Sequence, residues 1–259
     1  MGGWRWVLIA AGFGAAPTGA DEVSALPPPT GAGIERGVVA VQCFRDGAFS
    51  DGRAAILDVG TDVADVLLTT AHTLLPDADA IKRDCRVLVR GQPQNIAAVW
   101  HAGGNLLAVE QDWAVILTAR IPGDVRRWRA ANVTGEWLTN AAAHGAPVRL
   151  VMRYADAPQT DCRLEPQTPN PALLFAHSCV TYAGLSGSPL VVAIEGESEP
   201  VVIGIHVGVQ AYWRRQRLDF VHIARAVDPD VVAAIAAAEQ RAALAQAASV
   251  PQGRRGVAR

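Results

Sequence analysis

The chain has 259 residues, 50% of them hydrophobic and 19% charged, and its 25 acidic and 23 basic side chains leave a net charge of −2. This balance excludes a strongly basic domain that binds nucleic acid by neutralising phosphates, and it gives no polybasic membrane anchor. No uninterrupted apolar run reaches the roughly 18 residues that a transmembrane helix needs. The length accommodates one large domain or two small ones.

Residues 1–20 predict a secretory signal peptide. Arg5 supplies a positive charge, and the apolar run 6–16 that follows is too short to span a bilayer. Pro17 ends the run, and small residues follow at a candidate cleavage site. The alternative is an N-terminal helix packed on the core, which the lack of a polar face disfavours. Residues 21–33 contain three consecutive prolines and predict a linker or pro-segment. We therefore expect a secreted or periplasmic protein.

Four cysteines are present, an even number that indicates disulfides in an exported chain. They are Cys43, Cys85, Cys162 and Cys179. Four cysteines allow three pairings, and free buried thiols are the alternative. No Cys-x-x-Cys pair and no Cys/His cluster has the spacing of zinc ligands, so we expect neither a metal nor a cofactor.

From residue 37 onward, short apolar runs recur roughly every 10–15 residues, with Gly, Asp, Asn or Pro between them. The runs are 38–44, 54–59, 66–70, 86–89, 96–100, 113–117, 147–152, 173–175, 190–194, 201–207 and 218–223. This pattern is typical of an all-β sandwich or barrel. A soft boundary near residues 122–134 divides the pattern into two β-rich halves.

Helical periodicity is convincing only at the end of the chain. Apolar residues at 231, 232, 235, 238, 244 and 247 recur at helical spacing. Asp228 is a candidate N-cap, and Pro229 suits the first helical position. We expect a C-terminal helix over residues 227–248, followed by a disordered tail over 249–259.

Three short strings contain residues with catalytic potential. The string 67–72 ends in His72, the string 111–116 contains Asp112, and the string 184–190 contains Ser186. Taken singly, each reads as an edge residue or a tight turn. Their order, with spacings of 40 and 74 residues, makes a strong joint signal of a Ser-His-Asp triad.

The chemistry explains these residue types. The hydroxyl of Ser186 would be the nucleophile, and it needs a base such as His72 to take its proton. Asp112 would fix the imidazole tautomer and stabilise the imidazolium. Gly184 would let the loop turn so that its N–H and that of Ser186 form an oxyanion hole, in which one donor contributes about 3 kcal/mol.

With these three strings the sequence resembles the chymotrypsin-fold (trypsin-like) serine peptidases over about residues 34–245. The resemblance implies two six-stranded antiparallel β-barrels, which we assign to residues 34–130 and 131–226, with the active site between them and a C-terminal α-helix. It also implies a serine endopeptidase that works through an acyl-enzyme. We expect a monomer that acts on protein or peptide substrates, with no nucleic-acid partner and no stable membrane insertion after signal cleavage.

Details of the second half are similar to the bacterial V8-like, glutamyl endopeptidase branch. Leu185 stands where the animal digestive enzymes have the Asp that pairs with a new N-terminus, so that activation route is not available. The branch has Thr and His at the places of Thr181 and His206, where they help to bind an acidic P1 side chain. The alternative is a strand hydroxyl and a core histidine, and Val209 departs from the serine of the Glu-selective enzymes.

The resemblance also places Val180 at the base of the substrate pocket. With no carboxylate there, a preference for Lys or Arg at P1 is disfavoured, because a buried cation would have no counter-charge. For the cysteines, the resemblance implies a Cys162–Cys179 bridge ahead of the nucleophile loop and a Cys43–Cys85 bridge around the His72 loop. The other four histidines, at 101, 144, 177 and 222, show no ligand spacing and predict ordinary surface or core roles.

Two other functions are compatible with the same residues. One is a catalytically latent protein of this fold that serves as a binding or scaffold protein, because fold does not fix function. The other is an esterase that uses the same triad.

Overall fold

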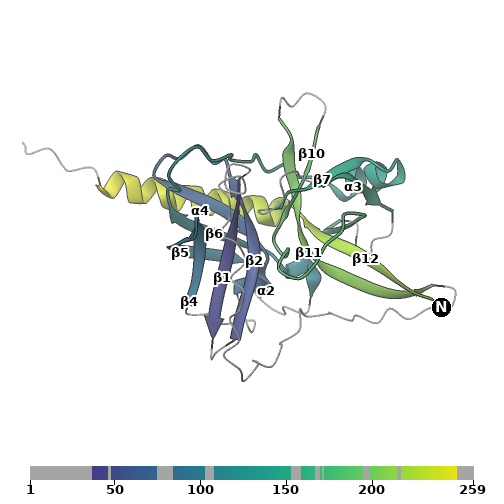
Figure 1. Cartoon of the computed structure of the whole chain (residues 1–259). Coiled ribbons are helices and arrows are strands. Elements are labelled where there is room, and N and C mark those ends of the chain that lie inside the picture. The colour runs from purple at the N-terminus through teal and green to yellow at the C-terminus, as the bar shows by residue number, and fades with distance from the viewer. Residues whose placement is uncertain are drawn as a thin grey trace, which may run out of the picture.

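The computed structural model describes residues 37–45, 48–74, 84–102, 108–152, 159–166, 170, 172–194, 199–214 and 217–249. They form two closed six-stranded barrels of antiparallel strands, and a C-terminal helix follows the second barrel (Figure 1). The predicted all-β, two-barrel architecture is therefore confirmed. The predicted signal peptide, the linker at 21–33 and the tail from residue 250 lie outside the described residues.

The first barrel has the strand order β1-β2-β3-β6-β5-β4. Its strands are β1 (Val38–Arg45), β2 (Ala48–Leu57), β3 (Ala64–Thr69), β4 (Asp84–Val89), β5 (Gln92–His101) and β6 (Ala114–Ala119). Every position of β3 is buried. Leu67 lies in the core enclosed by the barrel, whereas Val66 and Leu68 belong to a second cluster outside it. Burial on both faces explains why this strand is a continuous apolar run.

The second barrel has the order β10-β11-β12-β9-β8-β7. Its strands are β7 (Pro147–Leu150), β8 (Gln159–Glu165), β9 (Leu174–His177), β10 (Pro189–Val192), β11 (Val201–Arg214) and β12 (Arg217–Ala226). Its core is built around Leu150, Leu164, Phe175 and Leu190. The long β11–β12 hairpin projects away from the first barrel (Figure 1).

The connection between the barrels also fixes them relative to each other. Trp128 N–H donates to Ile56 O at 2.8 Å on the first barrel, and Ala131 N–H donates to Val202 O at 2.9 Å on the second. These two bonds lie only three residues apart along the chain. The segment around residues 128–131 therefore bonds to both barrels.

The C-terminal helix α4 (Pro229–Ser249) packs against the first barrel, although it follows the last strand of the second (Figure 1). Val227 N–H still bonds Ile203 O, and the helix begins at Pro229, the residue that suits the first helical position. Asp228 accepts from Val231 N–H at 3.1 Å and caps the helix as predicted. Ser249 is the last residue of the helix and not the first of a tail.

The apolar face of α4 differs from the predicted one. The buried residues are Val231, Ala234, Ala238 and Ala242, whereas Leu244 is 62% exposed. Small side chains at helical spacing let the helix approach the barrel closely. The sequence pattern predicted that Leu244 is buried because it counts large apolar residues, and this prediction is wrong.

Strand β8 and helix α3 are among the elements that were not predicted from the sequence. Strand β8 is mostly polar, so no apolar run marks it. Helix α3 (Gly135–Ala143) is short and buries only Leu138 and Ala142. It is capped locally, because Thr134 Oγ1 accepts from Trp137 N–H at 3.1 Å.

Two disulfides join the cysteine pairs that the resemblance implies. Cys43 on β1 is bonded to Cys85, directly opposite on β4, and Cys162 on β8 is bonded to Cys179, just after β9. Disulfides persist mainly in oxidising compartments, so they favour an extracellular or periplasmic location.

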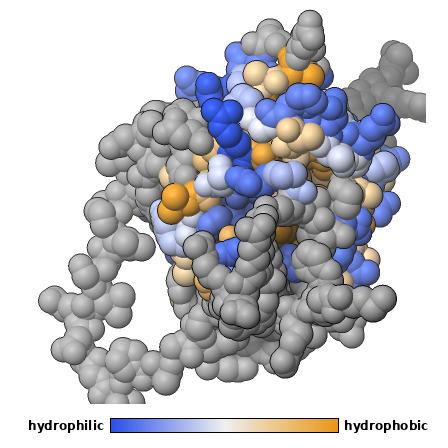
Figure 2. All heavy atoms as spheres, turned by 90° about the vertical axis from the view of Figure 1, so that its right-hand side faces the viewer, coloured by the Kyte–Doolittle hydropathy of each residue, from blue (hydrophilic) through white to orange (hydrophobic). Residues whose placement is uncertain are grey.

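Among the described helices, none has the length and apolar character needed to cross a membrane. Figure 2 shows hydrophobic residues in small separate groups among hydrophilic ones on the face at the right of Figure 1.

Candidate active site

His72 and Asp112 are brought together by the pairing of two strands. His72 lies on the one-turn helix α2 (Ala71–Leu74) directly after β3, and Asp112 lies directly after the 3-10 helix η1 (Val109–Gln111), ahead of β6. Because β3 pairs with β6 up to Thr69 opposite Ala114, the two following turns meet at one end of the first barrel.

Both oxygens of Asp112 hold His72. Oδ2 lies 2.6 Å from the imidazole Nδ1, and Oδ1 accepts from the backbone N–H of His72 at 2.9 Å. The carboxylate is 6% exposed and the imidazole is 40% exposed. A buried carboxylate bonded to Nδ1 favours the tautomer with its proton there, which leaves Nε2 able to accept a proton.

The loop that carries Ser186 is a tight turn with two left-handed glycines. Gly184 has φ +88° and Gly187 has φ +85°. Ser188 N–H donates to Leu185 O at 2.9 Å, which closes the turn around Ser186. A side chain at Gly187 would place its Cβ 1.9 Å from Arg53 O, so glycine is required there on steric grounds as well.

Both barrels hold this loop. On the second barrel, Gly187 N–H donates to His206 O and His206 N–H donates to Ser188 O. On the first barrel, Arg53 N–H on β2 donates to Ser186 O at 2.7 Å. A Cβ at Gly52 would lie within 3.1 Å of both Ser186 O and the side chain of Thr73, the neighbour of His72. The backbone of Ser186 therefore lies at the junction of the barrels, next to the helix of His72.

Ser186 is fixed through its backbone carbonyl, which accepts from Arg53 N–H. The geometry thus brings His72 and Asp112 into direct contact and places Ser186 beside them on a constrained turn.

The predicted pocket residues Thr181 and His206 lie in a cluster of three histidines. His206 on β11 shares a hydrogen bond with His177 on β9, with 3.2 Å between Nδ1 and Nε2. Thr181 Oγ1 shares a hydrogen bond with His222 Nδ1 on β12 at 2.6 Å. The three ring centroids lie 5.3, 5.8 and 6.3 Å apart. His206 is buried and bonds a partner, as the alternative of a core histidine expects, whereas Thr181 bonds a side chain and not the backbone.

The environment of these histidines favours their neutral forms. Burial, and then the charges of His222 and His72, lower the pKa of His206 to about 3. Burial and then the neighbouring His206 and His222 hold the pKa of His177 well below its usual value, and burial also lowers the pKa of His222. At neutral pH the cluster therefore presents neutral imidazoles, each able to donate one hydrogen bond and accept another. His72 is near enough to His206 to contribute to this lowering.

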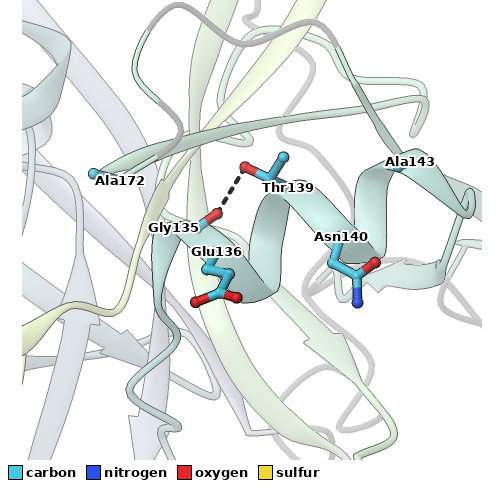
Figure 3. Close-up of a pocket in the computed structure, with 6 residues that line it drawn as sticks. All are labelled: Gly135, Glu136, Thr139, Asn140, Ala143 and Ala172. Carbon is cyan, nitrogen blue, oxygen red and sulfur yellow. Dashed lines mark hydrogen bonds between the residues drawn. The ribbon is translucent and has the colours of Figure 1, made fainter.

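Other predicted positions are more open. Val180, expected at the base of the pocket, is 69% exposed. An open depression beside α3 is lined by Gly135, Glu136, Thr139, Asn140, Ala143 and Ala172 (Figure 3). It holds no histidine and no cysteine, and its one internal hydrogen bond joins Thr139 Oγ1 to Gly135 O. No group of three or more His, Cys, Asp or Glu able to hold a metal ion occurs in the described part of the chain.

Sequence reasoning missed His177 and His222. Each lies on a strand with no motif around it, and they face each other because β12 pairs with β9 with His222 opposite His177. No pattern along the chain predicts that His177 and His222 are paired. Only knowledge of the strand register would have predicted it.

Comparison with solved structures shows the fold. The protease Anisep from Arthrobacter nicotinovorans superposes with a TM-score of 0.53 at 10% identity, over 80% of this chain and 97% of that one. The thermostable serine protease AL20 from an extremophilic microorganism gives 0.57 at 9% identity, over 80% and 99%. An inactivated protease paralogue of the scabies mite gives 0.54 at 13% identity, over 82% and 98%. The chain matches no family model and no curated protein. At these identities the likeness establishes the fold of chymotrypsin-like serine proteases, and the chemistry has to be argued from the residues of the site.

Proposed function

We propose that this chain is a serine endopeptidase in which Ser186, His72 and Asp112 form the catalytic triad. The observation that carries the proposal is the pair of hydrogen bonds from Asp112 to His72, made beside the turn of Ser186. A carboxylate that fixes a half-exposed imidazole next to a serine turn is the arrangement that activates a serine hydroxyl.

The proposed reaction has two steps. His72 Nε2 takes the proton of Ser186 Oγ as the oxygen attacks the peptide carbonyl, and the resulting imidazolium gives that proton to the leaving amine as the C–N bond breaks. Water then hydrolyses the acyl-enzyme by the same proton transfers. The N–H groups of Gly184 and Ser186 stabilise the oxyanion in both steps.

The first experiment is labelling with a fluorophosphonate probe. We expect stoichiometric labelling of the folded, disulfide-bonded protein and none of Ser186→Ala. Ser188→Ala is the matched control, because Ser188 Oγ is buried and has no hydrogen-bond partner among the described residues. Absence of labelling in the wild type would contradict the proposal and would favour a latent binding protein. That second candidate shares its fold with an inactivated protease paralogue.

We further propose the V8-like branch, with a preference for an acidic P1 residue. The support is the cluster of Thr181, His206 and their histidine partners. A neutral His206 donates a hydrogen bond to a carboxylate, and a bound carboxylate raises the pKa of the imidazole that it contacts. The cluster offers no carboxylate to a Lys or Arg side chain.

A P1 library of peptides tests this preference. We expect the kcat/KM ratio of Glu over Gln at P1 to fall by about tenfold in His206→Gln, the size of one lost charge-assisted hydrogen bond. His144→Gln is the control, because the imidazole of His144 lies on the surface after α3 and bonds the backbone carbonyl of Asn140. A wild type that does not prefer Glu would remove the V8-like assignment and leave the endopeptidase proposal intact.

A comparison of matched peptide and ester substrates separates a peptidase from an esterase. An esterase need not protonate a poor amine leaving group.

We also propose that the mature protein is secreted or periplasmic and acts as a monomer on proteins or peptides. The two disulfides support the compartment.

A further inference from the structure

An ion pair on strand β2 lies against the proposed oxyanion loop. Arg53 donates from a guanidinium nitrogen to Asp51 Oδ2 at 2.9 Å and to Gly52 O at 2.8 Å. The Arg53 side chain is 4% exposed and that of Asp51 is 22% exposed. An arginine so deeply buried on the wall of a barrel needs a reason, since charged side chains are rarely buried unless they are paired.

The backbone of Arg53 is tied to the nucleophile turn. Its N–H donates to Ser186 O, and its C=O accepts from Thr69 Oγ1 at 2.5 Å. The left-handed Gly187 packs on the same carbonyl. The position of the guanidinium is therefore set by the same strand segment that holds Ser186.

The side chains of the pair reach Gly184. A Cβ built on Gly184 would lie 3.4 Å from Asp51 Oδ2 and 4.0 Å from a guanidinium nitrogen of Arg53. Asp51 Oδ1 is buried and has no hydrogen-bond partner among the described residues. A carboxylate beside an oxyanion hole opposes the negative charge that develops in the transition state, unless a cation balances it.

We propose that Arg53 is a positioning residue that acts through Asp51: it balances the charge of the carboxylate that lies beside Gly184. Leu185 is buried in the core of the second barrel, and the carboxylate beside Gly184 comes from Asp51 on the first barrel. This inference rests on the proposed function, because the oxyanion forms only if Ser186 attacks.

Substitution of Arg53 separates charge from structure. Arg53→Met keeps an apolar stem and leaves the Asp51 carboxylate unbalanced. We expect kcat and the rate of phosphonylation to fall by at least about 30-fold with KM changed less than about threefold, because the lost interaction is made only in the transition state. Asp51→Asn/Arg53→Met removes both charges and should return the rate to within about threefold of the wild type. Asp51→Asn alone leaves a cation at the loop and should not slow the reaction.

The control is an ion-pair cluster of the first barrel in which Asp65 pairs with both Arg127 and Arg120. Arg127 Nε donates to Asp65 Oδ1 at 2.8 Å, and neither residue contacts the nucleophile turn in the described structure. Arg127→Met should lower the unfolding midpoint without changing kcat. If Arg53→Met does not fold, Arg53→Lys and Asp51→Asn carry the test, and each is expected to keep at least about a third of the wild-type rate.

The outcomes are distinct. A wild-type rate in folded Arg53→Met would overturn the inference, and so would a double variant as slow as Arg53→Met, which would indicate a merely structural role. If Arg53→Met is unfolded, a fall of more than about threefold in the rate of Asp51→Asn or Arg53→Lys would overturn the inference instead. If the wild type itself takes no probe, the proposed function fails first, and the inference falls with it.

Discussion

The two barrels have the same number of strands and differ in the polar groups that they bury. The enclosed core of the first barrel is apolar, and near the turn of Ser186 this barrel places His72 bonded to Asp112 and Arg53 paired with Asp51. The second barrel places His177, His206 and His222 together in its wall, and burial lowers the pKa of all three.

This contrast shows two environments for histidine near the turn of Ser186. In the first barrel a carboxylate stabilises the charged imidazolium, as a base that must accept a proton requires. In the second barrel, low polarity and neighbouring imidazoles oppose charging, which suits a hydrogen-bonding surface. In the proposed enzyme, the first barrel therefore supplies the proton transfer and the second barrel the nucleophile and the recognition of P1.

Asp112→Asn should remove the stabilisation of His72 by a carboxylate in the first barrel. Loss of the carboxylate changes the favoured tautomer of His72 and removes the stabilisation of its imidazolium, so we expect kcat to fall by about 10⁴-fold. Steady-state hydrolysis of the best library peptide measures the effect, with the exposed Asp58→Asn as the control. A loss smaller than about tenfold would mean that Asp112 does not orient the base.

Removing one disulfide at a time compares the stability of the barrels. The bridge of the first barrel closes 42 residues and that of the second closes 17. Loop entropy predicts that Cys43→Ala/Cys85→Ala loses about 4 kcal/mol of unfolding free energy and Cys162→Ala/Cys179→Ala about 3 kcal/mol. Urea unfolding of the two double variants measures both values. The reverse order would show that loop length does not control the stabilisation.

Two glycines with similar dihedral angles test the contact between the barrels. Gly187 has φ +85° and faces Arg53 O, whereas Gly91 has φ +78° and has no atom within 4 Å of a built Cβ. Gly91→Ala should lose about 1 kcal/mol from backbone strain alone, and Gly187→Ala more than about 2 kcal/mol because a clash is added. Thermal unfolding of both variants decides the comparison. Equal losses of stability in the two variants would mean that a Cβ at position 187 meets no close contact.

The pH dependence of stability should report on the second barrel. His206 has a pKa of about 3 in the folded protein and an ordinary value near 6.5 when unfolded. Below pH 6.5 the unfolded chain therefore binds a proton that the folded chain does not, and stability is lost as the pH falls toward 3. Relative to His206→Gln, we expect the wild type to lose roughly 1 kcal/mol more per pH unit between pH 6 and 4. Parallel slopes in urea unfolding at these pH values would contradict a buried, neutral His206.

Much of the fold could be predicted from the sequence. Eleven apolar runs correspond to strands, and the capped helix begins at Pro229, because alternation and capping are local. Strand β8 and helix α3 escaped prediction, since the first is polar and the second buries only two side chains. Leu244 was placed in the core because periodicity alone does not say which side of a helix meets the barrel.

For the site, the sequence by itself determined the order of His72, Asp112 and Ser186 and the glycines that shape the nucleophile turn. Those features are contiguous in the chain, and the chemistry restricts which residue types can fill them. Only the tertiary structure decided that His177 and His222 join His206, and that Asp51 and Arg53 lie beside Gly184. Strand register and the packing of one barrel on the other determine which distant residues face each other, and a one-residue shift in register would turn each side chain to the opposite face.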